Sequence, residues 1–145
     1  MKINTPYLGE VEYKKDEIIT FEKGLYGFEE KQEFLLINLE DPEFPFDWLQ
    51  SIDDEKLSFI ITSPFLFVKD YDFNLPDDIA KSLGIEKPKD ALIFSTVVLN
   101  EDLEKSTMNL QAPIIINRES KKGRQIILEK GYDVKYKFLL KKESN

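Results

Sequence analysis

The sequence contains no cysteine and no histidine, and these two absences exclude most of the common catalytic and metal-binding chemistry. Without cysteine, the chain can form no disulfide and offers no thiolate as a nucleophile or metal ligand. Without histidine, it lacks the commonest general acid–base at neutral pH and the commonest transition-metal ligand. A zinc site, a Ser-His-Asp triad and a Cys-His pair are therefore excluded. We predict a protein that is not an enzyme and that uses no metal and no cofactor.

Long apolar runs are absent as well. No stretch approaches the roughly 18 consecutive apolar residues that a membrane-spanning helix needs. Residues 1–6 hold no apolar segment of the kind found in secretory signals. We therefore expect no contact with membranes and a cytoplasmic location.

The chain does contain enough apolar material for a core. Of its 145 residues, 41% are hydrophobic and 12% are aromatic. A chain of this length can bury roughly 68–70% of its unfolded surface. Because no linker, repeat or low-complexity segment divides it, we expect one domain over residues 1–145, with a Lys-rich C-terminal extension from about residue 129.

The net charge of −8 is unevenly distributed along the chain. Residues 1–117 carry 11 basic and 24 acidic side chains, whereas residues 118–145 carry 9 basic and 4 acidic ones. Such asymmetry suggests that one surface meets a charged partner, although solubility alone would also account for it. An acidic body disfavours direct binding to nucleic acid, because phosphates require clustered Lys and Arg.

Apolar residues recur with a period of two along most of the chain, as they do in β-strands. Residues 91–99 (ALIFSTVVL) are apolar at both parities, which indicates a central strand that is buried on both faces. Many short strands separated by turn residues predict a mainly β fold, a small antiparallel β-barrel-like domain. Further strands are predicted around Val11 and Tyr13 and over residues 34–39, 57–62, 110–117, 125–128 and 134–140.

Signals for helices are few. Pro76, Asp77 and Asp78 favour the start of a helix, because proline is tolerated in the first turn and carboxylates there complement the helix dipole. Gly84 is placed to end that helix after about two turns. A second short helix or turn is predicted over residues 46–51.

Residues 21–29 (FEKGLYGFE) carry two glycines three positions apart. Gly24 and Gly27 favour a tight loop with positive φ that turns Phe21 and Phe28 inward. The spacing matches neither the dinucleotide-binding nor the P-loop glycine pattern. A structural turn is therefore the preferred interpretation.

Residues 63–73 (SPFLFVKDYDF) place their aromatic side chains at one parity. If the segment is extended, these aromatics face a core, and Asp70 and Asp72 lie side by side on the outer face, roughly 6.6–7 Å apart. Paired carboxylates can act as a general acid and base, but an apolar pocket that would raise a carboxyl pKa is not evident. A docking surface for a basic partner is the better interpretation. The aromatic set comprises Phe65, Phe67, Tyr71 and Phe73.

Residues 106–117 (STMNLQAPIIIN) begin as a polar loop and continue into a strand. Pro113 cannot donate a hydrogen bond to a neighbouring strand, so it marks an edge position or a bulge. Asn109 and Asn117 lie at the two ends of residues 110–116 of the segment. Each asparagine can cap the local backbone or contact a partner.

Together, the last three segments resemble the pattern of the FliW family, from about Ile3 to Leu128. The resemblance implies a small, β-barrel-like cytoplasmic protein without catalytic activity. It implies two partners, flagellin and the RNA-binding regulator CsrA, and relief of the repression that CsrA exerts on flagellin translation. The sequence departs from the pattern in its C-terminal extension and at Tyr26, where many members carry proline. The partner-binding residues predicted on this basis are Asp70, Tyr71, Asp72, Asn109, Leu110 and Asn117.

Two other functions stay open at this point. A carboxylate-dependent hydrolase would need a deep pocket around two close carboxylates. An RNA-binding protein would use the basic C-terminal strand, and its binding would be sensitive to salt. The residues of that strand are Lys135, Tyr136, Lys137, Lys141 and Lys142.

Overall fold

The computed structural model describes residues 1–38, 45–129 and 131–138, and within them the protein is mainly β. One α-helix, α1 (Asp77–Leu83), is present among these residues, together with four short 3₁₀ helices, η1 (Lys15–Glu17), η2 (Pro64–Leu66), η3 (Pro88–Asp90) and η4 (Leu103–Lys105). The strands are β1 (Lys2–Thr5), β2 (Gly9–Glu12), β3 (Ile18–Thr20), β4 (Glu33–Asn38), β5 (Asp47–Ser51), β6 (Ser58–Thr62), β7 (Ala91–Val98), β8 (Thr107–Met108), β9 (Ile114–Asn117), β10 (Gly123–Gln125) and β11 (Tyr136–Lys137).

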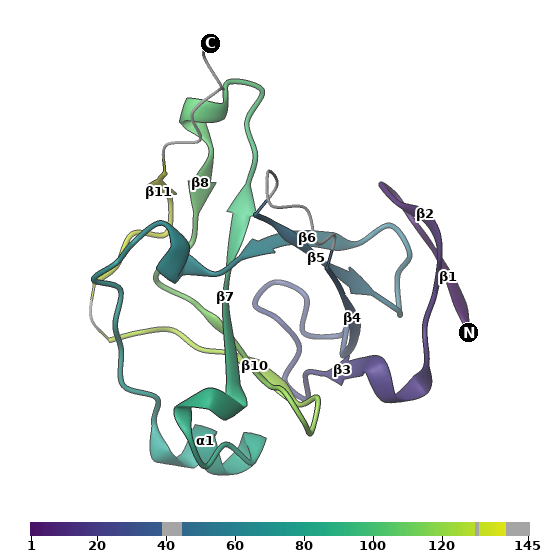
Figure 1. Ribbon diagram of the computed structural model, residues 1–145, viewed down its shortest axis with the longest axis horizontal. Helices are drawn as coiled ribbons and strands as arrows, with labels where there is room; N and C mark the ends of the chain where they lie inside the picture. Colours follow the sequence, from purple (N-terminus) through teal and green to yellow (C-terminus); the bar gives the residue numbers. More distant parts are fainter. Residues whose placement is uncertain (39–44, 130, 139–145) are drawn as a thin grey trace.

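Nine of the strands form one antiparallel sheet that curls toward closure. Its main path runs β10-β9-β7-β6-β5-β4-β3, and β8 and β11 branch from β7. The two ends of this path meet at Thr20, which forms an isolated bridge with Lys122 and donates its N–H to the carbonyl of Lys121 at 2.8 Å. Figure 1 shows β3, β4, β5, β6, β7 and β10 arranged around a common centre, with the β1–β2 hairpin to one side. The predicted β-barrel-like architecture is therefore confirmed, with one bridge in place of a continuous closing ladder.

Strand β7 is the centre of the sheet, as its sequence predicts. One edge pairs with β6, and the other pairs with β9 near its start and with β8 near its end. Alternate side chains enter two different cores: Phe94 packs in one, and Val97 and the half-buried Ile93 pack in the other. A strand that is covered on both faces needs apolar residues at both parities, which is the pattern of residues 91–99.

The two cores lie on opposite faces of β7 and β9. The first is enclosed by the curled sheet and contains the fully buried Phe21 and Phe34, whose rings meet edge to face at 5.5 Å. The second fills the space between the sheet, α1 and the C-terminal segment, and contains Tyr71, Leu110 and Phe138. The C-terminal segment up to Phe138 therefore packs against the body of the protein.

Helix α1 begins and ends as predicted. Pro76 precedes its first residue, Asp77 and Asp78 lie in the first turn, and Gly84 adopts a φ of 73° and donates its N–H to the carbonyls of the last turn. The amide of Asn117, at the end of β9, donates to the carbonyl of Leu83 at 2.7 Å. This bond fixes the end of the helix to the sheet.

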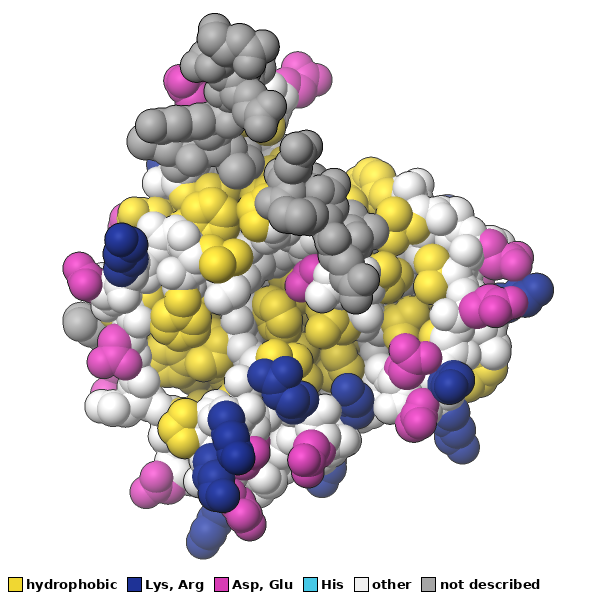
Figure 2. Space-filling view, viewed as in Figure 1, with side chains coloured by type: hydrophobic (Ala, Val, Ile, Leu, Met, Phe, Trp, Pro, Cys, Tyr) yellow, Lys and Arg dark blue, Asp and Glu magenta, His cyan; other side chains and the backbone are white. Residues whose placement is uncertain are grey.

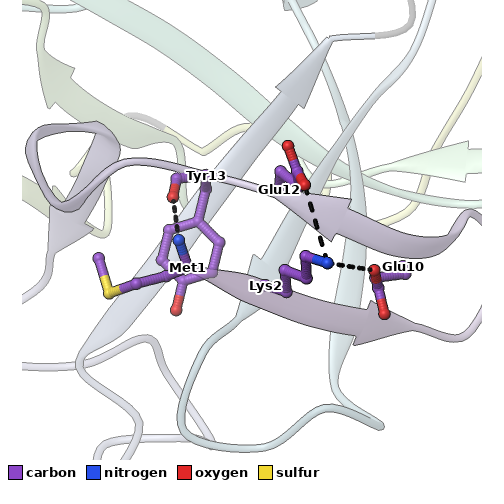
Figure 3. Close-up of polar contacts among 5 residues, drawn as sticks. All are labelled: Met1, Lys2, Glu10, Glu12 and Tyr13. Carbon is purple, nitrogen blue, oxygen red and sulfur yellow. Dashed lines mark hydrogen bonds and ion pairs between the residues drawn. The ribbon is translucent and has the colours of Figure 1, made fainter.

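The N-terminal hairpin of β1 and β2 forms a separate two-stranded sheet. Met1 and Tyr13 exchange backbone hydrogen bonds of 3.1 and 2.9 Å, and Lys2 forms ion pairs with Glu10 and Glu12 at 3.4 and 3.9 Å (Figure 3). These ion pairs are exposed, so their contribution to stability is small. The hairpin contacts the main sheet through Tyr7, whose ring stacks on Trp48 at 4.7 Å.

The structure corrects several predicted elements. Residues 47–51 form β5, which pairs with β4 and β6, and not the predicted helix or turn. Because β5 is buried on both faces, its sequence lacks the period of two that would have indicated a strand. Residues 64–66 form a 3₁₀ helix, so the extended conformation predicted over residues 63–73 is wrong there. Strand β9 begins only at residue 114. Leu139 and Leu140 of the predicted last strand, and Leu39 of an earlier one, lie outside the described residues.

Candidate functional site

Residues 109–113 connect β8 to β9 and lie at the centre of the candidate site. Both strands pair with the same edge of β7, so the connecting segment leaves that edge and returns to it. Pro113 stands at the return, as expected of a residue that cannot donate to a ladder. The backbone of the segment is instead satisfied by neighbouring segments: Leu110 donates to Asp133 at 2.9 Å, and Gln111 accepts from Leu128 at 2.9 Å.

Two tyrosines hold this segment against residues 71–72. The hydroxyl of Tyr71 donates to the carbonyl of Leu110 at 2.7 Å, and the ring of Tyr71 meets that of Tyr132 edge to face at 4.8 Å. The hydroxyl of Tyr132 donates to the carbonyl of Asp72 at 2.8 Å. Burial, and then the neighbouring Tyr132, raise the pKa of Tyr71 well above its usual value. Its phenol therefore stays protonated and remains a donor at physiological pH.

Asn109 caps the turn that opens the segment. Its side-chain oxygen accepts from the N–H groups of Gln111 and Ala112 at 3.0 and 3.1 Å, and its own N–H donates to Thr96 of β7 at 3.0 Å. The capping interpretation is therefore correct for the side-chain oxygen. Asn109 is half-buried and lines the smaller cleft, so the residue is partly open to the surface.

Two clefts flank this framework and share part of their lining. The larger cleft has a volume of about 680 Å³, and its lining includes Asp72 and Glu129. The smaller cleft has a volume of about 320 Å³, and its lining includes Asn109 and Phe59. The residues common to both clefts are Tyr26, Gln125 and Ile127.

Exposed apolar side chains gather at these clefts. Tyr26, Ile127 and Val134 are 53%, 61% and 57% exposed, and all three line the smaller cleft. Phe28 beside them is partly exposed and packs edge to face on Phe59 at 5.2 Å. We call Tyr26, Phe28, Ile127 and Val134 the apolar patch. Large exposed apolar groups that cluster in this way are typical of protein–protein interfaces.

A third cleft, of about 350 Å³, lies on the other side of residues 72–74, which also line the larger cleft. Its lining is mainly apolar and includes Phe65, Ile93 of β7 and Ala80 of α1. Figure 2 shows apolar side chains exposed between α1 and β7, the elements that border this cleft. Phe65 is 43% exposed, so its predicted place in the core is wrong, whereas Tyr71 is buried as predicted.

The structure brings five of the six predicted partner-binding residues together. Asp70 and Asp72 are exposed on either side of the buried Tyr71, which is joined to Leu110 next to Asn109. Tyr71 and Leu110 are buried, so they pack beneath the exposed residues and do not form the surface themselves.

The sixth predicted residue, Asn117, lies elsewhere. It is 4% exposed, and its side chain bonds to Leu83 and to the N–H groups of Glu119 and Ser120. These bonds give Asn117 an internal role, and its contact with a partner stays a prediction.

The apolar patch as a whole is not predictable from the sequence. Tyr26 lies between Gly24 and Gly27, both of which have positive φ as predicted, but the loop turns only Phe21 fully inward and leaves Phe28 at the surface. The signal for Tyr26 was an aromatic at the tip of a glycine turn. Ile127 and Val134 had no comparable signal, because single apolar residues are common on protein surfaces.

No group of acidic side chains that could hold a metal ion occurs among the described residues. Asp72 and Glu129 line the larger cleft together with Arg124, but Asp70 does not line it. The carboxylate pair predicted from the sequence therefore does not converge in a cleft. In the part of the chain that the structure describes, no helix is long and apolar enough to span a membrane.

Comparison with known proteins identifies the family. Residues 2–139 match the family model described as FliW protein. The chain belongs to the FliW family. The flagellar assembly factor FliW of Clostridium novyi is 45% identical over 137 residues, which cover 94% of this chain and 95% of that protein. The FliW of Alkaliphilus metalliredigens is 40% identical over 129 residues, which cover 89% of this chain and 80% of that one.

A solved FliW structure confirms the fold. The crystal structure of a flagellar assembly factor FliW superposes with a TM-score of 0.90 at 34% identity. The match covers 98% of this chain and 99% of the FliW chain. The resemblance noted in the three sequence segments is therefore confirmed, and the mainly β architecture is that of a FliW protein.

Proposed function

We propose that this FliW-family chain is a non-enzymatic regulator in the cytoplasm that binds CsrA and, in competition with it, flagellin. Binding of CsrA would relieve its repression of flagellin translation. Flagellin that has not been exported would then occupy the chain and restore repression. Family membership supports this proposal, because the relatives described above are named flagellar assembly factors.

The observation that carries the proposal is the apolar patch beside two clefts. Tyr26 and Ile127 line both clefts and are more than half exposed, although each is large enough to contribute to a core. Interfaces commonly concentrate their binding energy in a few such side chains, with polar groups around them. Asn109, Gln111 and Thr96 supply polar groups at the smaller cleft. This combination suits a protein partner better than a small charged substrate.

The acidic residues beside the larger cleft suit a basic partner. Asp70 and Asp72 are exposed, and the first 117 residues carry far more acidic than basic side chains. CsrA must itself attract RNA, so a basic surface is expected on it. Opposite charges would speed the encounter and help the partners to exchange.

The two alternatives have weaker support. For a hydrolase, the predicted pair of Asp70 and Asp72 would have to meet in one cleft, but Asp70 does not line the larger cleft that Asp72 lines. For an RNA-binding protein, Lys135 and Lys137 are exposed near the two-residue strand β11, but the remainder of the chain is strongly acidic. Phosphates would be repelled by most of the surface.

Size-exclusion chromatography of purified proteins tests the proposal. The chain is mixed at micromolar concentration with CsrA, and separately with flagellin, each from the same genome. We expect a discrete complex in both mixtures and displacement of CsrA when flagellin is added. If neither mixture yields a complex, the proposed function is wrong.

A further inference from the structure

Gln125 links two segments that line the smaller cleft from different parts of the chain. It is the last residue of β10 and is buried, with 9% of its surface exposed. Its side-chain oxygen accepts from the N–H of Tyr26 at 2.9 Å, and its side-chain nitrogen donates to the carbonyl of Ala112 at 3.0 Å. One amide therefore connects the loop that carries Tyr26 to the segment that follows Asn109.

The orientation of this amide is fixed by its partners. A backbone N–H can only donate and a carbonyl can only accept, so the oxygen of Gln125 must face Tyr26 and its nitrogen must face Ala112. Neither contact depends on the side chain of Tyr26, which is free to project from the loop. An apolar residue of similar size at position 125 would fill the space but make neither bond.

The loop held by Gln125 is a tight turn with Tyr26 at its tip. Phe28 donates its N–H to the carbonyl of Leu25 at 2.7 Å, and Gly27, the third residue, has a φ of 86°. This combination defines a type II turn with Tyr26 in the second position, where proline is also well tolerated. The turn's own hydrogen bond holds the backbone around Tyr26 in shape, and the side chain of Gln125 joins this turn to Ala112.

We propose that Gln125 is a positioning residue for partner binding. By bonding to Tyr26 and Ala112, it sets the separation between the exposed Tyr26 ring and the polar groups of Asn109 and Gln111. A partner that contacts both would then depend on a buried amide that it does not touch itself. This inference rests on the proposed function, because it concerns the same surface.

Four variants separate the roles of the two residues. Tyr26→Ala removes the exposed ring but keeps the N–H that Gln125 accepts. Tyr26→Pro also removes the ring and is compatible with the turn, but it has no N–H, so the comparison of the two tests this hydrogen bond in a turn that either residue allows. Gln125→Leu removes both bonds and keeps the ring. Gln125→Glu keeps an acceptor for Tyr26 and, when ionised, has no donor for Ala112.

Gln50→Leu is the matched control. Gln50 is also a buried amide, and its nitrogen donates to the carbonyls of Ser51, Glu55 and Leu57. It lines none of the three clefts. The control therefore reports what the loss of a buried amide does to stability without a change at the surface in question.

Dissociation constants for flagellin and CsrA, and amide hydrogen exchange at Tyr26 in the absence of a partner, test the inference. We expect Gln125→Leu to weaken binding about five- to thirtyfold and to speed exchange at Tyr26, whereas Gln50→Leu changes neither. Tyr26→Pro should bind more weakly than Tyr26→Ala. Gln125→Glu should weaken binding while the amide of Tyr26 stays protected.

Two results would overturn the inference. One is unchanged exchange at Tyr26 in Gln125→Leu, which needs no partner to measure. The other is parental affinity of Gln125→Leu and Gln125→Glu in an experiment where Tyr26→Ala loses affinity, which would leave the proposed function standing. If the parent chain binds neither partner, it is the proposed function that fails, and the exchange measurement still decides the role of Gln125.

Discussion

Asn109 combines a structural role with a position at the proposed binding surface. Its side-chain oxygen caps two N–H groups, and the residue also lines the smaller cleft. Asn109→Asp keeps the capping oxygen but removes the amide donor and adds a charge. We expect its unfolding curve to stay close to that of the parent. If the amide donates a hydrogen bond across the interface, the free energy of partner binding should weaken by roughly 1–3 kcal/mol.

Asn109→Ala is the companion variant for this prediction. It removes the cap and should lower the free energy of unfolding by about 1 kcal/mol. Chemical denaturation and titration calorimetry of both variants provide the two measurements. If Asn109→Asp loses stability but keeps its affinity, Asn109 acts as a cap and does not contact a partner.

For single residues, the sequence predicts the backbone conformation that a position requires better than it predicts whether the side chain is exposed. Gly24 and Gly27 have the predicted positive φ, and a β-carbon at Gly24 would lie 2.5 Å from the backbone of Glu29. A type II turn accepts tyrosine as well as proline at its second position, so Tyr26 fits the turn. The backbone of Tyr26 is also bonded to the side chain of Gln125, a contact between residues 99 positions apart. No local pattern encodes such a contact.

Strand β7 is the element on which the fold depends most. Phe94 is 7% exposed and packs among Phe34, Ile61 and Ile114 in the core that the sheet encloses. Phe94→Ala should lower the free energy of unfolding by about 3–5 kcal/mol, because it removes a buried ring and leaves a cavity. Such a loss is a large part of the ~5–15 kcal/mol that stabilises a typical domain.

Thermal or urea unfolding of Phe94→Ala checks this prediction. Val98→Ala is a suitable control, because Val98 lies on the same strand but is 69% exposed. We expect the control to change stability by no more than about 0.5 kcal/mol. Equal and small losses in both variants would mean that β7 is not the centre of the core.

Elements are predictable where their burial pattern is simple. The two-sided burial of β7 and the proline, acidic and glycine signals of α1 could be read directly from the chain. Strand β5 could not, because four of its five residues are buried and alternation is lost. Residues 110–113 have the composition of a strand but leave the edge of β7. Their backbone bonds instead to both backbone and side-chain groups of distant segments, such as Leu128 and Tyr71.

For the molecule as a whole, charge favours encounter with a basic partner. Replacing Asp70 and Asp72 with Lys reverses two exposed charges and should change the free energy of unfolding by no more than about 0.5 kcal/mol. We expect the double variant to associate more slowly with CsrA at low salt and to show a weaker dependence on ionic strength. Stopped-flow association at several salt concentrations measures both effects.

Glu10→Lys combined with Glu12→Lys is the control for this charge reversal. These glutamates are also exposed and two positions apart, but they lie on the β1–β2 hairpin. The net charge changes equally in the two double variants. An equal reduction in association rate would show that total charge, not the position of Asp70 and Asp72, guides the partner.

The face around Tyr26 and Ile127 is the surface on which we propose that CsrA and flagellin bind. Tyr7→Ala provides the control, because Tyr7 is 69% exposed and lines none of the three clefts. The decisive measurement is titration calorimetry of CsrA and of flagellin into the parent, the Tyr26→Ala/Ile127→Ser double variant and the control. We predict that the double variant loses at least about 2 kcal/mol of binding free energy for one or both partners, as expected for central interface residues, while Tyr7→Ala binds like the parent. Parental affinity of the double variant for both partners would contradict the account.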